Sequence, residues 1–163
     1  MNLVVHNLKG GVGKSLTAIH MAAAIAMGKR AVCLLDGDTQ GHASQGLGVA
    51  RRPAFERWLR EGIWEPEQAR DYLEVLPGAR GSRGWFGQVT ADTTRQRWAT
   101  LPPYDYAIVD APGYDPWQIP WLVPHAALRG APPHEKRGAV AKDARRSREE
   151  GGTSVVLRGR WLV

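Results

Sequence analysis

Short runs of apolar residues recur through the first two thirds of the chain, and stretches rich in polar and helix-forming residues separate them. The runs are continuous rather than alternating, which is typical of strands buried on both faces of a parallel sheet. They predict four strands, at residues 3–6, 31–35, 72–76 and 104–109. The intervening stretches predict a loop at 81–87 and helices at 14–27, 53–61 and 90–100, with a further short helical piece near 66–70. This alternation predicts a doubly wound α/β fold, a parallel sheet with flanking helices.

The helix predicted at 14–27 has one apolar face, and Gly28 is its expected C-terminal stop. The helical period gathers on that face Leu16, Ile19, His20, Ala23 and Met27. Tryptophans are frequent in the middle of the chain, and we expect packing between helices to be their use at Trp58, Trp64, Trp85 and Trp98.

The character of the chain changes near Trp121, where the apolar runs at α/β spacing stop. We expect residues 1–121 to form one domain and residues 122–163 to form an irregular basic tail, with 124–152 poorly ordered. Within the tail, 142–150 would suit one charged helix, but it has little apolar stripe to dock it. Two later pieces have a strand-like pattern, Val155–Leu157 and Trp161–Val163.

Composition narrows the class of protein. The chain has 163 residues, enough for one domain, and a net charge of +6. Nine lysine or arginine residues and only four acidic ones lie in 124–163, so +5 of this charge belongs to the tail and the case for nucleic-acid binding is weakened. The single cysteine, Cys33, excludes a disulfide framework within one chain. No apolar stretch is long enough to span a bilayer, and no signal peptide is evident, so we expect a cytoplasmic protein without a membrane partner.

A glycine-rich segment, Lys9 to Ser15, directly follows the first predicted strand and opens the first predicted helix. Glycines let backbone N–H groups close around anionic oxygens, and the helix N-terminus adds its positive dipole end. Lys14 would reach the terminal phosphates, and the hydroxyl of Ser15 would bind Mg²⁺. This segment indicates a nucleoside triphosphate ligand, bound by Lys9, Gly10, Gly11, Val12, Gly13, Lys14, Ser15 and Leu16.

Two further predicted strands end in carboxylates. Asp36 and Asp38 follow the second, and Asp110 follows the fourth. Carboxylates at the C-terminal edge of parallel strands face the crevice where α/β folds bind ligands. Asp38 would order a water against the γ-phosphate or join the metal shell, although a plain polar turn remains an alternative there. Asp110 has the Walker B arrangement, in which the carboxylate holds Mg²⁺ through water.

Two histidines and a group of arginines are weaker candidates. His6 is expected to be a tolerated polar residue near the loop, and His42 is equally compatible with a phosphate contact and a solvated position. A solvated helix face explains Arg51, Arg52, Arg57 and Arg60 better than a DNA-binding stripe, because Glu56 and Glu61 are interleaved with them.

The glycine-rich segment departs from the general P-loop, which has glycine where this chain has Leu8 and lacks the lysine found here at Lys9. The segment resembles the deviant Walker A motif of ParA/MinD-type ATPases, in which the extra lysine reaches across a dimer to the partner's phosphates. The resemblance therefore implies that Lys9 and Lys14 are both catalytic.

Other segments extend the resemblance to ParA-type partition ATPases over about residues 1–120. The stretch Asp36–His42 resembles switch I, although Thr39 replaces the usual proline. On that resemblance Asp38 is catalytic and positions the attacking water, and Asp36 and Gln40 belong to the switch. Pro112 and Gly113 resemble the start of switch II.

The resemblance implies an ATP-sandwich homodimer that forms with nucleotide, uses ATP and Mg²⁺, and hydrolyses ATP slowly. It also implies a centromere-binding, ParB-like partner and a role in moving plasmid, phage or chromosomal DNA; non-specific DNA binding is weakly supported. The chain leaves the family pattern soon after Asp115. We therefore expect a C-terminally truncated member with a deficient base pocket, and the alternative is a nucleotide-binding or interaction module without turnover. A MinD-like membrane role would need an amphipathic C-terminal helix, and the metal-cluster relatives would need paired cysteines.

Overall fold

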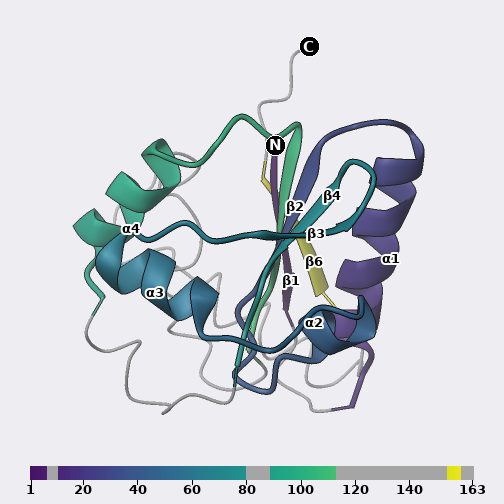
Figure 1. Cartoon of the computed structure of the whole chain (residues 1–163), viewed down its shortest axis with the longest axis horizontal. Coiled ribbons are helices and arrows are strands. Elements are labelled where there is room, and N and C mark those ends of the chain that lie inside the picture. Colours follow the sequence, from purple (N-terminus) through teal and green to yellow (C-terminus); the bar gives the residue numbers. More distant parts are fainter. Residues whose placement is uncertain (7–10, 80–88, 113–153, 159–163) are drawn as a thin grey trace, which may run out of the picture.

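A mixed six-stranded sheet forms the centre of the computed structural model, which describes residues 1–6, 11–79 and 89–112 and the backbone of 154–158 (Figure 1). The strands are β1 (Asn2–His6), β2 (Val32–Asp36), β3 (Glu67–Arg70), β4 (Leu73–Leu76), β5 (Tyr106–Asp110) and β6 (Ser154–Arg158). Their order across the sheet is β3-β4-β2-β5-β1-β6. The four inner strands are parallel, whereas β3 and β6 pair antiparallel at the two edges.

Helices cover both faces of the sheet (Figure 1). The helices α1 (Lys14–Met27) and α2 (His42–Gly46) lie on one face, and α3 (Ala54–Glu61) and α4 (Ala91–Ala99) lie on the other. Successive residues of the inner strands point to opposite faces, so Leu34 packs in the core under α1 while Cys33 and Leu35 pack under α3. This double burial is the physical reason for the continuous apolar runs, and the predicted α/β fold is confirmed. None of the described helices has both the length and the apolar character needed to cross a bilayer.

The strand predictions agree with β1, β2, β4 and β5, and the helix predictions agree with α1, α3 and α4. The short helix expected near 66–70 is wrong, because Glu67–Arg70 forms β3. Glutamate, glutamine, alanine and arginine favour helix locally, but a turn at Asp71-Tyr72 folds this segment back along β4. The short helix α2 was not predicted. The pieces expected at 81–87, 124–152 and 161–163, Trp85 included, lie outside the described residues, whereas Val155–Leu157 falls within β6.

Helix α1 docks on the sheet through a fully buried stripe of alanines, which is flanked by the partly buried Ile19, Met21 and Ile25. The apolar face predicted from Leu16, His20 and Met27 is therefore wrong at these three exposed positions. Ala18, Ala22 and Ala26 are buried, whereas Leu16 is 57% exposed and Met27 is 85% exposed. Small side chains let the helix approach the strands closely, so alanines take the fully buried positions and the larger residues pack at their sides.

Aromatic rings fill the opposite face. Trp58 lies at the centre, with ring centroids 5.4 Å from Trp64 and 5.6 Å from Trp98, both in edge-to-face geometry. Phe55 contacts Trp58, and Tyr104 contacts Trp64. These tryptophans therefore pack α3 against α4, as the sequence predicted.

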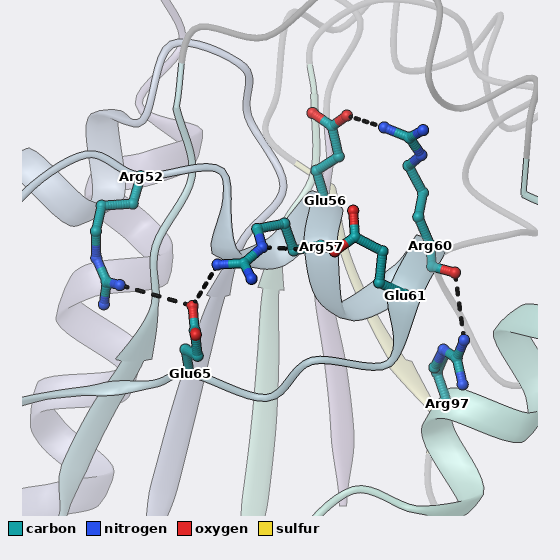
Figure 2. Close-up of polar contacts among 7 residues, drawn as sticks. All are labelled: Arg52, Glu56, Arg57, Arg60, Glu61, Glu65 and Arg97. Carbon is teal, nitrogen blue, oxygen red and sulfur yellow. Dashed lines mark hydrogen bonds and ion pairs between the residues drawn. The ribbon is translucent and has the colours of Figure 1, made fainter.

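The outer side of α3 carries paired charges (Figure 2). Arg57 lies 2.8 Å from Glu65 and 3.6 Å from Glu61, and Arg60 donates to Glu56. Arg97 of α4 reaches the carbonyl oxygen of Arg60 at 3.3 Å. Since acidic partners offset Arg57 and Arg60, the outer side of α3 is a solvated helix face and not a basic stripe.

Candidate active site

The carboxyl ends of the inner strands bring the predicted acidic residues to one edge of the sheet. Asp36 and Asp110 are direct partners in the β2–β5 register, and Asp110 also pairs with Val5 at the end of β1. Gly37 follows this edge so closely that a Cβ there would lie 3.0 Å from the carbonyl oxygen of Asp110. The carboxyl ends of β1, β2 and β5 therefore lie side by side.

The glycine-rich turn enters α1 through left-handed backbone. Gly11 has φ +71° and Gly13, the N-cap of α1, has φ +82°. A Cβ at either position would meet nothing within 4 Å, so glycine is required here by conformation and not by packing. The open space in front of the turn, together with the N–H groups of the first helical turn, suits an anion. Lys9 and Gly10 lie outside the described residues.

Lys14 and His6 lie together beside this turn. Lys14 is buried, with 9% of its surface exposed. Burial, and secondly the charge of Lys14, lowers the pKa of His6 to about 4, against a weaker opposing effect of the Pro112 backbone. His6 is therefore neutral at pH 7 and adds no second cation to the site.

Asp110 is completely buried, and no described residue donates a hydrogen bond of normal geometry to its carboxylate oxygens, although the Ser15 hydroxyl lies near enough to favour the charged form. Burial raises its pKa to about 7, and the charges of Asp36 and Asp38 add to the effect, while Ser15 and Lys14 favour the charged form. A buried carboxylate without donors is costly unless a cation satisfies it. One carboxylate and one nearby hydroxyl, from Ser15, fit Mg²⁺, which keeps most of its waters and takes few protein ligands.

Asp36 is also buried but is fully engaged in holding the loop after β2. Its Oδ2 accepts hydrogen bonds from the backbone N–H of Ser44 at 2.8 Å and from the Ser44 hydroxyl at 2.6 Å. Its Oδ1 accepts from the N–H of Asp38 at 3.3 Å. Burial raises the pKa of Asp36, whereas the hydrogen bonds from Ser44 lower it. Asp36 therefore anchors α2 to the end of β2.

The residues after β4 pack against Asp36 and Ser44. The N–H of Gly78 donates to the Ser44 hydroxyl at 3.1 Å. A Cβ at Gly78 would lie 2.6 Å from the carbonyl oxygen of Asp36, so only glycine fits. Ser44 and Gly78 were not among the predicted site residues, because each acts through contacts between segments that are distant in the sequence. The sharp stop of the apolar run at Pro77-Gly78 was their one visible signal.

Asp38 projects from the loop that Asp36 anchors, and 13% of its side chain is exposed. Its Oδ1 accepts from the N–H of Gln40 at 3.1 Å, and its Oδ2 lies 3.4 Å from Nδ1 of His42. The N–H of Gly41 closes the turn onto the carbonyl oxygen of Asp38 at 2.9 Å. Arg51 donates to the carbonyl oxygen of Gln40 at 3.3 Å, a contact that the sequence did not predict. The loop therefore has a defined shape.

The structure thus places most predicted site residues at one edge of the sheet, namely Gly11, Gly13, Lys14, Ser15, Asp36, Asp38, Gln40, Asp110 and Pro112. Gly113 lies outside the described residues, as do Lys9 and Gly10. Leu16 is mostly exposed on the first turn of α1. The arrangement combines a glycine-rich turn that opens a helix, a buried carboxylate and a second carboxylate that solvent reaches.

Comparison with known proteins agrees with this geometry. Residues 3–150 match the model of the CobQ/CobB/MinD/ParA nucleotide binding domain. The chain is 34% identical over 124 residues to the chromosome partitioning protein ParA of Myxococcus xanthus, covering 68% of this chain and 44% of that protein. It spans about half the length of the curated relatives it matches.

Two solved structures have the same fold. One is an ATP complex of a McdA variant from Cyanothece, with a TM-score of 0.64, 21% identity and coverage of 74% of this chain and 51% of that one. The other is cobyrinic acid a,c-diamide synthase from Mycobacterium smegmatis with a bound ATP analogue and magnesium, with a TM-score of 0.66, 20% identity and coverage of 91% and 68%. The chain belongs to the CobQ/CobB/MinD/ParA family of nucleotide-binding domains.

Proposed function

We propose that this protein is a Mg²⁺-dependent, ParA-like ATPase of DNA partition, with the activity in residues 1–121. The observation that carries the proposal is Asp110, a completely buried carboxylate without a described donor, at the edge where the glycine-rich turn and Asp38 also lie. A metal ion bound here would satisfy the buried carboxylate of Asp110, and the glycine-rich turn would bind the triphosphate.

Each residue then has a role that follows from its position. Backbone N–H groups of residues 10–15 and the Lys14 ammonium bind the β- and γ-phosphates, with further contacts at Leu16. The Ser15 hydroxyl holds Mg²⁺ directly and Asp110 holds it through water. Bound Mg²⁺ supplies charge neutralisation at the phosphates. Asp38 orients the attacking water, since its carboxylate is the one that solvent reaches.

The proposal includes partners. Lys9 acts across a nucleotide-dependent homodimer, and a centromere-binding, ParB-like protein stimulates turnover. The names of two relatives, a chromosome partitioning protein and a chromosome-partitioning ATPase, support the partition context of this proposal. Binding of non-specific DNA is the weakest element, because basic residues on α3 are paired with acidic ones.

The test is a paired measurement of Mg-ATP binding by calorimetry and of phosphate release. Lys14→Gln should abolish binding, because the buried ammonium is lost. Lys29→Gln is the matched control, since it removes an exposed lysine beyond the other end of α1. Asp38→Asn should keep binding and lose turnover.

Two outcomes would change the proposal. If Lys14→Gln binds Mg-ATP as the unaltered chain does, the site assignment is wrong. If the unaltered chain binds Mg-ATP but releases no phosphate, the protein is a nucleotide-binding module without turnover.

A further inference from the structure

We propose that His42 is a positioning residue for Asp38, holding the carboxylate in the orientation that aligns the attacking water. The inference rests on the proposed hydrolysis of ATP and adds a residue to that site. It starts from one contact: Nδ1 of His42 lies 3.4 Å from Oδ2 of Asp38. The sequence alone left His42 undecided between a phosphate contact and a solvated position.

With this contact, both carboxylate oxygens of Asp38 have a neighbouring polar group. The backbone N–H of Gln40 holds Oδ1 at 3.1 Å, and the His42 ring stands at Oδ2. A carboxylate held at one oxygen can still rotate about its last torsion, which is broad. A second group at the other oxygen restricts that rotation, while each oxygen keeps a lone pair for water.

The backbone around His42 is fixed by contacts that do not involve its ring. Ser44, two residues on, is tied to Asp36 by two hydrogen bonds and is completely buried. Gly41, directly before His42, has φ +63°, and a Cβ there would lie 2.7 Å from the carbonyl oxygen of Gly78. The backbone at His42 is therefore fixed, and its ring keeps a defined position beside Asp38.

The exposure of the His42 side chain excludes core packing, and its contact with Asp38 favours positioning. The His42 side chain is 59% exposed, whereas the Asp38 side chain is 13% exposed. A partly exposed pair contributes modestly, so we expect a change in rate and not a loss of the fold. The ring touches the group that orients water, and it acts through Asp38.

The experiment measures kcat and KM for Mg-ATP on the full chain with His42→Leu and His42→Asn. Leucine removes the ring nitrogen that faces Oδ2 of Asp38, and kcat should fall about two- to fivefold with KM unchanged, because ground-state binding is not touched. Asparagine carries an N–H donor at the same number of bonds from Cβ as Nδ1, so it should restore most of kcat. His20→Leu is the matched control, since His20 is exposed on α1 and away from the loop.

A second readout does not depend on turnover. The Nδ1 resonance of His42 in a ¹⁵N spectrum should move on Asp38→Asn, while that of His20 should stay in place. An unchanged His42 resonance, or a His42→Asn variant that loses as much kcat as His42→Leu, would overturn the inference. If Lys14→Gln leaves turnover unchanged, the proposed function fails instead, and the resonance still decides whether His42 faces Asp38.

Discussion

Two aspartates that are neighbours across the sheet have opposite surroundings. Asp36 ends β2 and Asp110 ends β5, they pair in register, and each is at most 1% exposed. Asp36 accepts three hydrogen bonds from Ser44 and Asp38, whereas Asp110 accepts none from the described residues. The same residue type at the same level of the sheet therefore has hydrogen-bond donors in one strand and lacks them in the next.

The difference separates a structural carboxylate, Asp36, from Asp110, the carboxylate that we propose to hold the metal ion of a ligand. Burying a carboxylate costs free energy that only donors or a cation return. Around Asp36 the protein supplies the donors, so the loop after β2 is shaped before any ligand arrives. Around Asp110 it supplies only the nearby Ser15 hydroxyl and the charge of Lys14, which favour the charged form but do not offset burial. On the function proposed above, a bound Mg²⁺ would return this free energy at Asp110.

The largest expected effect comes from removing the charge at Asp110. Burial and neighbouring charges raise its pKa from 3.8 to about 7. Between these values the unfolded chain holds fewer protons than the folded one, so stability falls as the pH rises through this window. Asp110→Asn should therefore raise the free energy of unfolding by roughly 3–4 kcal/mol at pH 8, with the gain vanishing toward pH 4. Urea denaturation at both pH values measures it.

The control for this variant is Asp71→Asn, which changes an exposed aspartate in the turn between β3 and β4. It should show no such pH-dependent gain. Asp110→Asn should also weaken Mg-ATP binding, so the variant gains stability while it loses ligand. Equal stability of the variant and the unaltered chain at pH 8 would mean that Asp110 is already satisfied, and the contrast with Asp36 would disappear.

The contrast could be predicted from the sequence only in part. Strand ends and the glycine-rich turn are local features, so Asp36, Asp110 and Lys14 could be placed at one edge from apolar runs and spacing alone. Their different surroundings depend on Ser44 and Gly78, which are 34 residues apart and meet only in the folded chain. No local pattern carries that information.

The errors in the fold have the same origin. Residues 66–70 have the composition of a helix but pair with β4, because an available strand edge outweighs a weak local preference. In α1 the periodic large residues do not mark the buried stripe, since close approach to the sheet selects alanines. Helix propensity and hydrophobic periodicity describe a segment in isolation. In both cases the strands that the segment packs against determine its structure or its buried face.

A smaller effect is expected from the donors of Asp36. Ser44→Ala removes the 2.6 Å hydrogen bond to the buried carboxylate and the acceptor of the Gly78 N–H. The variant should lose about 2–3 kcal/mol of unfolding free energy, since a charged group loses a buried partner. Ser15→Ala is the matched serine on the Asp110 side and should change stability by less than about 1 kcal/mol while it weakens Mg-ATP binding. Equal losses of stability in both variants would contradict the division between the two aspartates.

The smallest effect is expected from one methyl group in the glycine-rich turn. Gly13 has φ +82° and Gly48 has φ +75°, and a Cβ at either position meets nothing within 4 Å. Alanine at each should therefore cost the same strain, about 1 kcal/mol of unfolding free energy. Only Gly13→Ala should also weaken Mg-ATP binding, because its methyl group enters the space that the phosphates need, whereas Gly48 lies after α2. Thermal unfolding with and without Mg-ATP measures both quantities. An equal response of the two variants to nucleotide would place the phosphates away from the turn, and the metal ion of Mg-ATP would then not explain the buried carboxylate of Asp110.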